Sequence, residues 1–171
     1  MERLYTPWRM QYIAAANQTV DGCIFCALLA DDAGSDRENF IVYRAQTTFV
    51  VMNIYPYNTG HLMVLPFEHA ARLSALPAQT QLEMMTISAY CTELLTELMD
   101  PDGFNIGLNL GRAGGAGVDS HLHLHIVPRW TGDSNFMTVI GETRVLPETL
   151  TDTYDRIMAL IEQRPPDLPT R

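Results

Sequence analysis

The sequence predicts a single α+β domain built around an antiparallel sheet. Three observations lead to this class: strand-like segments occur in runs, one long helical segment divides these runs, and the chain length suits one sizeable core. Of its 171 residues, 47% are hydrophobic and 18% are charged, which is typical of a globular protein rather than a disordered one. The predicted domain therefore spans residues 1–171.

Five segments are predicted as strands, because aromatic and β-branched residues are frequent in them or because apolar and polar residues alternate. They are residues 40–44, 47–53, 61–65, 104–110 and 121–127. In the fourth segment, the alternate apolar residues from Phe104 to Leu110 share one face, which predicts a half-buried strand.

Three helices are predicted beside these strands. The first follows Thr6 and Pro7, a capping residue and a proline suited to the first helical position. The longest ends at the Asp-Pro-Asp-Gly sequence that begins at Asp100, and the last covers about residues 147–161. The proline-rich tail, about residues 164–171, is expected to fray. The apolar positions that mark the longest helix are Leu82, Met85, Ala89, Leu95 and Met99.

The formal net charge of -9 argues against nucleic acids and anionic membranes as partners, because both are bound through basic surfaces. No apolar run approaches the ~20 residues that span a bilayer. The N-terminus has no apolar signal core, so we expect a cytoplasmic protein. A substrate that carries phosphates would need local positive or hydrogen-bonding groups to overcome the acidic field.

Three of the five histidines lie in one strand segment, as His121, His123 and His125. Side chains alternate across a strand, so all three are predicted on one face, opposite Leu122 and Leu124. One interpretation is a catalytic metal centre. However, the first and third imidazoles of such a strand stand too far apart to share an ion, because alternate residues are ~6.6 Å apart. The other interpretation is nucleophilic catalysis, since a neutral imidazole attacks phosphorus readily.

The His-x-His-x-His sequence, followed by two apolar residues, resembles the signature of the histidine triad family of nucleotide hydrolases and transferases. Further segments are similar to other blocks of that family, and some resemble the branch that includes the diadenosine tetraphosphate phosphorylases. These segments are Asn53–Pro66, Asn109 with the glycine-rich loop 111–117, Pro128–Met137 and Tyr5–Met10. The resemblance covers most of the chain and implies the five-stranded sheet of that family, with one long helix and shorter flanking helices.

The resemblance assigns roles residue by residue. It implies that His123 attacks the α-phosphorus and becomes nucleotidylated, that His125 hydrogen-bonds the α-phosphate, and that His61 lies beside them. It implies further substrate contacts. These are ribose at Asn53, phosphate at Asn109 and at backbone N–H groups of Gly115 and Gly117, and a specificity position at Trp130. Trp130 could equally be a core or dimer residue.

The chain departs from the family pattern four residues before the first triad histidine. Many hydrolases of the family have glutamine there and a phosphorylase relative has serine, whereas this chain has Gly117. A side-chain donor is therefore missing, and the choice between phosphorolysis and hydrolysis stays open. Backbone donors or Arg112 are the candidates to replace it.

Cys23 and Cys26 form a Cys-x-x-Cys motif, which alone is compatible with a metal site, a redox pair or buried apolar residues. In several bacterial members of the family this motif supplies half of a structural zinc site. The resemblance implies that His69 and His121 supply the other half, giving the Cys₂His₂ set of tetrahedral zinc. Cys91 is expected in the core.

The activity that the resemblance implies is cleavage of dinucleoside polyphosphates between the α- and β-phosphates, with phosphate or water resolving the intermediate. Hydrolysis of nucleoside phosphoramidates or aminoacyl-adenylates is the enzymatic alternative, and a non-catalytic nucleotide-binding protein is the third. The resemblance also implies a homodimer that joins two sheets at their edges, and it leaves open a Mg²⁺ ion bound with the nucleotide.

Overall fold

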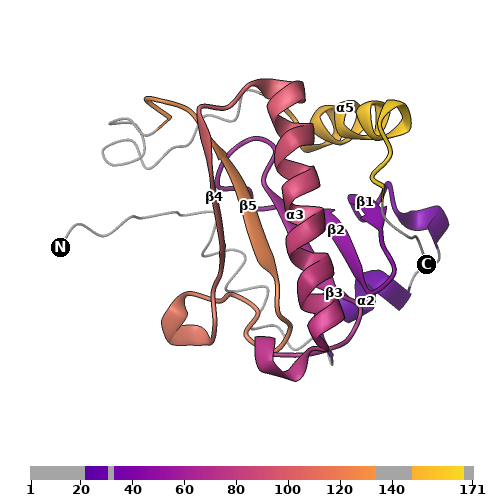
Figure 1. The fold of residues 1–171 in the computed structure, drawn as a ribbon, viewed down its shortest axis with the longest axis vertical. Helices are drawn as coiled ribbons and strands as arrows, with labels where there is room; N and C mark the ends of the chain where they lie inside the picture. Colours follow the sequence, from indigo (N-terminus) through magenta and orange to yellow (C-terminus); the bar gives the residue numbers. More distant parts are fainter. Residues whose placement is uncertain (1–21, 31–32, 134–147, 168–171) are drawn as a thin grey trace.

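The computed structural model describes residues 22–30, 33–133 and 148–167. Five strands form one antiparallel sheet in the order β1-β2-β3-β5-β4 (Figure 1). They are β1 Ile41–Arg44, β2 Thr48–Met52, β3 Leu62–Pro66, β4 Gly103–Leu108 and β5 Leu124–Arg129. The predicted α+β class and the five-stranded sheet are confirmed.

In the part of the chain that the structure describes, three helices accompany the sheet: α2 Ile24–Ala30, α3 Ala78–Met99 and α5 Leu150–Gln163. Short 3₁₀ turns occur at η1 Ala33–Ser35, η2 Leu73–Ala75 and η3 Arg112–Gly114. α3 ends at Asp100, whose φ of 45° is left-handed and whose N–H still donates to Thr96. The predicted stop before Pro101 is therefore confirmed. The helix predicted after Thr6 lies outside the described residues. In the described part of the chain, no helix combines the length and apolarity that crossing a membrane requires.

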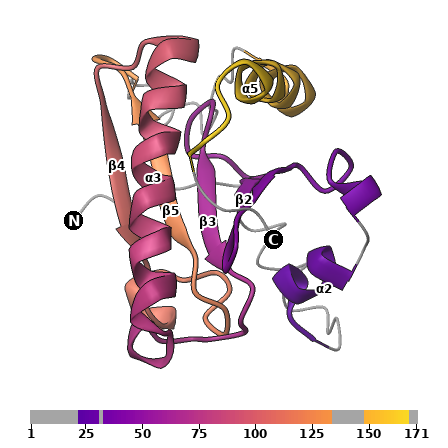
Figure 2. The same ribbon diagram turned by 45° about the vertical axis from the view of Figure 1, so that its right-hand side comes forward.

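The sheet is covered on both faces (Figure 2). In β3, Leu62 and Val64 pack with α3 and α5 in the larger core, whereas Met63 and Leu65 pack with Phe25 of α2 in a smaller one. Successive strand residues face opposite sides of the sheet. Because both sides are covered here, every residue of β3 is buried. The face that bears α2 is also the face of the histidines.

The apolar stripe that predicts α3 is buried only in part: Leu95 lies in the core and Met99 packs against it. Leu82 and Met85 are 61% and 56% exposed, while a neighbouring stripe faces the sheet. Apolar spacing identifies a helix but cannot choose between two apolar stripes, because packing decides that. Cys91 is buried, as expected. The buried residues of α3 include Met84, Ile87, Ser88, Cys91, Leu94 and Leu95.

The histidine strand begins three residues later than predicted, at Leu124 rather than His121. The reason is a local change of partner: the Leu122 N–H donates to the Ala70 carbonyl at 2.7 Å, in the loop after β3. The pairing of β5 with β4 starts only at Leu124. His121 and His123 thus lie in an extended lead-in, and their register is set by the loop after β3.

Candidate active site and metal centre

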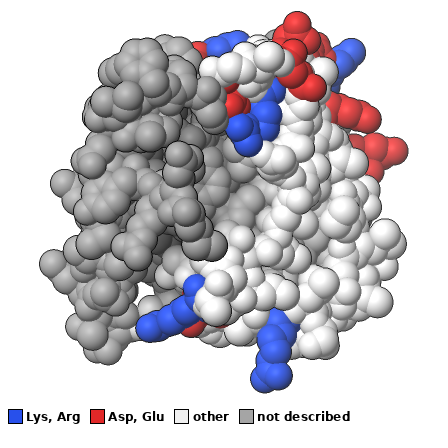
Figure 3. Space-filling view, turned by 90° about the vertical axis from the view of Figure 1, so that its left-hand side faces the viewer, with Lys and Arg blue, Asp and Glu red and all other residues white. Residues whose placement is uncertain are grey.

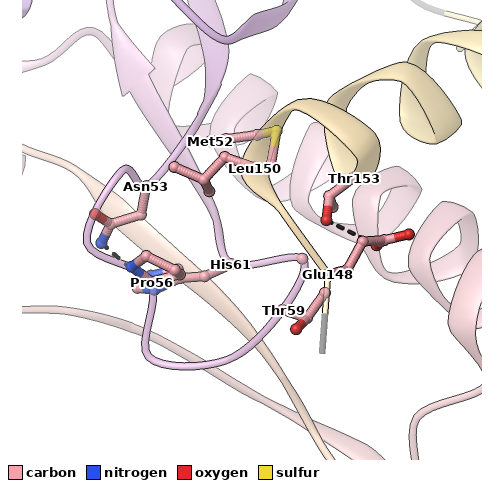
Figure 4. A pocket seen from close by; sticks show the side chains of 9 residues that line it. Met52, Asn53, Pro56, Thr59, His61, Glu148, Leu150 and Thr153 are labelled. Atoms are coloured by element: carbon pink, nitrogen blue, oxygen red, sulfur yellow. Dashed lines mark hydrogen bonds between the residues drawn. The ribbon is translucent and has the colours of Figure 1, made fainter. Parts of the chain in front are cut away.

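Three of the predicted histidines meet beside the start of β3. His61 Nε2 lies 3.0 Å from His125 Nδ1, and the rings of His123 and His125 are 4.9 Å apart and nearly perpendicular. All three are buried, with 1–9% of each exposed. Figure 4 shows His61 next to Asn53, at the two ends of the loop between β2 and β3. The structure therefore brings together the residues predicted as catalytic.

A backbone donor determines where the protons of two histidines lie. The Tyr57 N–H points at His61 Nδ1 at 3.0 Å, so Nδ1 must accept and the proton of a neutral His61 lies on Nε2. That proton points at His125 Nδ1, which must also accept. The neutral His125 then carries its proton on Nε2, as a hydrogen-bond donor directed away from His61.

His123 has the opposite arrangement. Its Nδ1 lies 2.8 Å from the carbonyl oxygen of His121, which can only accept, so Nδ1 carries the proton. The lone pair of the neutral ring is then on Nε2. Burial lowers the pKa of His123, with the carbonyl bond opposing that shift, and this favours the neutral form. A neutral imidazole with a fixed Nε2 lone pair is the form needed for attack on phosphorus.

Two asparagines border this group. The Asn109 amide nitrogen lies 3.4 Å from His125 Nε2. Because both groups are donors when His125 carries its proton on Nε2, exchange of the Asn109 amide oxygen and nitrogen would supply the acceptor. Asn53 accepts from the Tyr55 N–H at 2.9 Å, and its amide nitrogen lies 3.4 Å from His61 Nδ1. Both predicted substrate contacts are therefore placed beside the histidines, one on each side.

The glycine loop between β4 and β5 uses several of its own N–H groups. Gly114 and Ala116 both donate to the carbonyl of Gly111, and Gly115 donates to that of Arg112. Gly115 has a φ of 91°, which favours glycine. Of the two glycines predicted to bind phosphate, Gly115 is therefore already a donor inside the loop, and the contact of Gly117 with phosphate remains a prediction. The Arg112 side chain pairs with Asp119 at 3.1 Å.

Trp130 lies at the other end of β5 from the histidines. Its indole nitrogen donates to the carbonyl of Asp100, at the end of α3, at 3.2 Å. The structure does not bring it to His125 within one chain, so its contact with substrate remains a prediction.

A small cavity of about 10 Å³ separates the His61 loop from the start of α5. It is large enough for about one water molecule and far too small for a nucleotide. This cavity is therefore not the substrate site. Figure 4 shows its lining: Met52, Asn53, Pro56, Thr59, Gly60, His61, Glu148, Leu150 and Thr153.

The four residues predicted to hold zinc converge on one point. The ligand atoms of Cys23, Cys26, His69 and His121 all lie within 4.8 Å of one another. His121 Nε2 faces the Pro66 carbonyl at 2.9 Å, so it carries the proton and leaves the Nδ1 lone pair toward the sulfurs. Among the described residues, this is the one group of three or more such side chains placed to bind a metal.

The spacings fit a tetrahedral ion. With Zn–S near 2.3 Å and Zn–N near 2.0–2.1 Å, the S···N edge of a tetrahedron is roughly 3.6 Å. His121 Nδ1 lies 3.4 Å from the sulfur of Cys23 and 3.6 Å from that of Cys26, and His69 Nδ1 lies 3.3 Å from Cys26. Burial raises the pKa of the Cys26 thiol, and the neighbouring Cys23 adds to this, so a bound cation would be needed to hold Cys26 as a thiolate.

Two site residues have no signal in the sequence. Tyr57 acts through its main-chain N–H, which no residue type reveals. Phe25 packs its ring 5.6 Å from that of His121 and 5.3 Å from that of His123. Its place between Cys23 and Cys26 is the only sequence feature that could have indicated it.

Comparisons with known proteins identify the relatives of this chain. A model of the HIT domain family matches residues 35–132. The chain is 38% identical over 170 residues to the AP-4-A phosphorylase of Mycobacterium tuberculosis, covering 97% of this chain and 87% of that one. It is 29% identical over 109 residues to the adenosine 5'-monophosphoramidase of Schizosaccharomyces pombe, covering 63% and 74% of the two chains. A Zn-bound histidine triad family protein of Mycobacterium smegmatis matches with a TM-score of 0.66 and 28% identity, over 83% of this chain and 94% of that one.

Proposed function

The chain belongs to the HIT domain family, and from this premise we propose that it cleaves dinucleoside polyphosphates, such as diadenosine tetraphosphate, by nucleotidyl transfer to His123. The observation that carries the proposal is the buried His123, whose Nδ1 faces a carbonyl oxygen at 2.8 Å, so that the lone pair of the neutral ring lies on Nε2. Burial lowers the pKa of this imidazole and so favours that form. The AP-4-A phosphorylase that covers nearly the whole chain supports the choice of substrate.

In the first step, His123 Nε2 attacks the α-phosphorus and a P–N bond forms. The bond from the α-phosphorus to the bridging oxygen breaks, and the rest of the polyphosphate leaves on that oxygen. The Nε2–H of His125 donates to an oxygen of the α-phosphate, where negative charge builds up. His61 holds that proton in place by donating to the other nitrogen of His125.

In the second step, an oxygen of inorganic phosphate attacks the same phosphorus and the P–N bond breaks. The nucleoside diphosphate leaves, and His123 is restored with its lone pair on Nε2. Water in place of phosphate would release a nucleoside monophosphate instead. We assign the ribose to Asn53 and phosphate oxygens to Asn109 and the Gly117 N–H, because the two amides border the histidines. Trp130 stays a candidate specificity position.

A second candidate is hydrolysis of nucleoside phosphoramidates. The similarity to an adenosine 5'-monophosphoramidase favours it, because the same attack by His123 would break a P–N bond instead of a P–O bond. A nucleotide-binding protein without activity is the weakest reading, since each triad histidine is held in a defined hydrogen-bonded state.

Product analysis separates these functions. With diadenosine tetraphosphate and inorganic phosphate, we expect ADP and ATP in equal amounts, because phosphate resolves the nucleotidyl intermediate. AMP plus ATP, independent of phosphate, would replace phosphorolysis by hydrolysis. Turnover of adenosine 5'-phosphoramidate but not of the tetraphosphate would overturn the proposed substrate class.

We assign the Cys₂His₂ group to a structural zinc ion, because the four side chains would fill all four coordination positions of a tetrahedral ion. When bound, zinc would tie Cys23 and Cys26 of the α2 segment to His69 and His121. It would supply no open coordination site for substrate. The group is not suited to Mg²⁺, which prefers oxygen ligands.

We propose that two chains associate through the β4 edge. Within the described ranges, β4 pairs with β5 and with no other strand, and Ile106 on β4 is 46% exposed. Figure 3 views the side of the molecule toward β4, where the described surface is largely uncharged and charged residues lie near its margins. An uncharged face beside an open strand edge fits continuation of the sheet into a second copy.

Replacing Ile106 with lysine is expected to convert the dimer to a monomer, because it places a charge on the strand through which the two chains would pair. Light scattering after size-exclusion chromatography gives the mass. Glu162→Lys on the exposed side of α5 adds the same positive side chain elsewhere and should leave the dimer intact. A monomeric unmodified chain would contradict this assembly.

A further inference from the structure

A polar cluster, separate from the histidines, joins the end of β5 to the loop between β2 and β3. Asp133 receives hydrogen bonds from Arg129 Nε at 2.6 Å and Arg129 Nη2 at 2.8 Å. Its Oδ2 also receives one from the Asn58 amide at 2.7 Å. The same Asn58 nitrogen donates to the Pro128 carbonyl at 3.0 Å. The Asn58 side chain thus connects the loop to two acceptors at the end of β5, the Pro128 carbonyl and the Asp133 carboxylate.

Hydrogen bonds keep the Asp133 carboxylate ionised and fix its position. Its hydrogen bonds to Arg129 hold its pKa well below its usual range, and its side chain is 11% exposed. The Trp130 N–H adds a further bond at 3.2 Å. A fixed, ionised acceptor gives the Asn58 amide one defined position rather than several.

The loop that Asn58 connects to β5 also supplies the backbone groups that determine which nitrogen of His61 carries the proton. The Asn58 carbonyl accepts the His61 N–H at 3.2 Å, and the adjacent Tyr57 N–H donates to His61 Nδ1 at 3.0 Å. The Tyr57 ring also lies 4.8 Å from that of His61 and 5.8 Å from that of His125. A shift of Asn58 would therefore move the one backbone donor that orders the His61–His125 pair.

We propose that Asn58, fixed by Asp133, is a positioning residue that keeps the proton of His61 on Nε2 and so keeps His125 a donor toward the substrate phosphate. The expected effect of Asn58 on the reaction rate rests on the proposed nucleotidyl transfer. The expected effect of Asn58 on the protonation of His61 and His125 does not depend on which substrate is used.

The direct test measures the protonation of the imidazole nitrogens by NMR in ¹⁵N-histidine-labelled protein. The unmodified chain should show His61 as the Nε2–H form alone. Asn58→Ala should give a mixture of the two neutral forms at His61, because the Tyr57 N–H is no longer held over Nδ1. A single unchanged Nε2–H form in Asn58→Ala would overturn the proposal, whether or not the protein turns over any nucleotide.

Kinetics provides the second readout. Asn58→Ala should lower kcat about tenfold and change KM less than about twofold, since positioning acts on the reacting groups. Asp133→Asn should give a smaller loss of the same kind. Asp36→Asn is the matched control: it breaks another bidentate pair, with Arg44, that has no bond to the histidine loop, and it should leave kcat unchanged.

A double-mutant cycle excludes a general structural effect. In a His61→Ala background, Asn58→Ala should cause little further loss of kcat, because the residue it positions is absent. If Asn58→Ala lowers kcat equally with and without His61, the residue acts on the fold and the proposal is wrong. Absence of all turnover in the unmodified chain would instead refute the proposed function, and the NMR result would still decide the positioning role.

Discussion

Replacing His123 with alanine is expected to lower kcat for diadenosine tetraphosphate by at least about a thousandfold, because it removes the atom that forms the P–N bond. Removal of this buried ring also costs packing against Phe25, but His121 still fills the metal group, so we expect the variant to fold. Steady-state assays, with circular dichroism to confirm folding, measure the effect.

Added imidazole provides the matched control for this variant. The space left by the His123 ring lies beside His125, so free imidazole can enter it and attack phosphorus in place of the side chain. Partial recovery of turnover would show that a nucleophile, rather than a fold, was lost. A variant that keeps most of its rate without imidazole would contradict the mechanism.

Loss of the metal is expected to have the largest effect on stability. The protein purified without chelator should contain about one zinc per chain, and Cys26→Ser should contain much less. Because the ion would join α2 to His69 and His121, its loss should cost at least about 3 kcal/mol and lower Tm by roughly 10 °C. It should also lower activity, since the carbonyl of His121 orients His123. Metal analysis and thermal unfolding test both statements.

Cys91→Ala is the control for the cysteine substitution. Cys91 is buried in α3, away from the metal group, so this variant should keep its zinc while losing some packing. Equal zinc contents in Cys26→Ser and in the unmodified chain would contradict the assigned site.

Much of the fold could be predicted from local sequence. The strands follow aromatic and β-branched runs, and α3 stops where Asp100 and Pro101 require it. The exposed face of α3 could not be predicted, because Leu82 and the buried Met84 have similar hydrophobicity and only the packed sheet distinguishes their positions. The start of β5 was missed for a related reason: a single hydrogen bond from Leu122 to Ala70 decides it.

In the candidate site, too, one part could be predicted from the sequence and another part could not. The resemblance of the histidine and cysteine segments to the histidine triad family predicts which side chains meet, and their residue types carry the chemistry. The groups that fix the orientation and protonation of these histidines are mostly backbone groups: the N–H of Tyr57 and the carbonyls of His121 and Pro66. Every residue has these groups, so no pattern of residue types could reveal them. Their positions follow only from the folded chain.

The central claim is that His123 carries the nucleotide during turnover, and one measurement tests it most directly. The protein is mixed with diadenosine tetraphosphate without inorganic phosphate and quenched in alkali, which preserves a P–N bond. Mass spectrometry of the intact chain and its peptides then locates any adduct. The account predicts one added AMP group, on the peptide that contains His123, and none in His123→Ala. Turnover with no adduct, or an adduct on another residue, would contradict it.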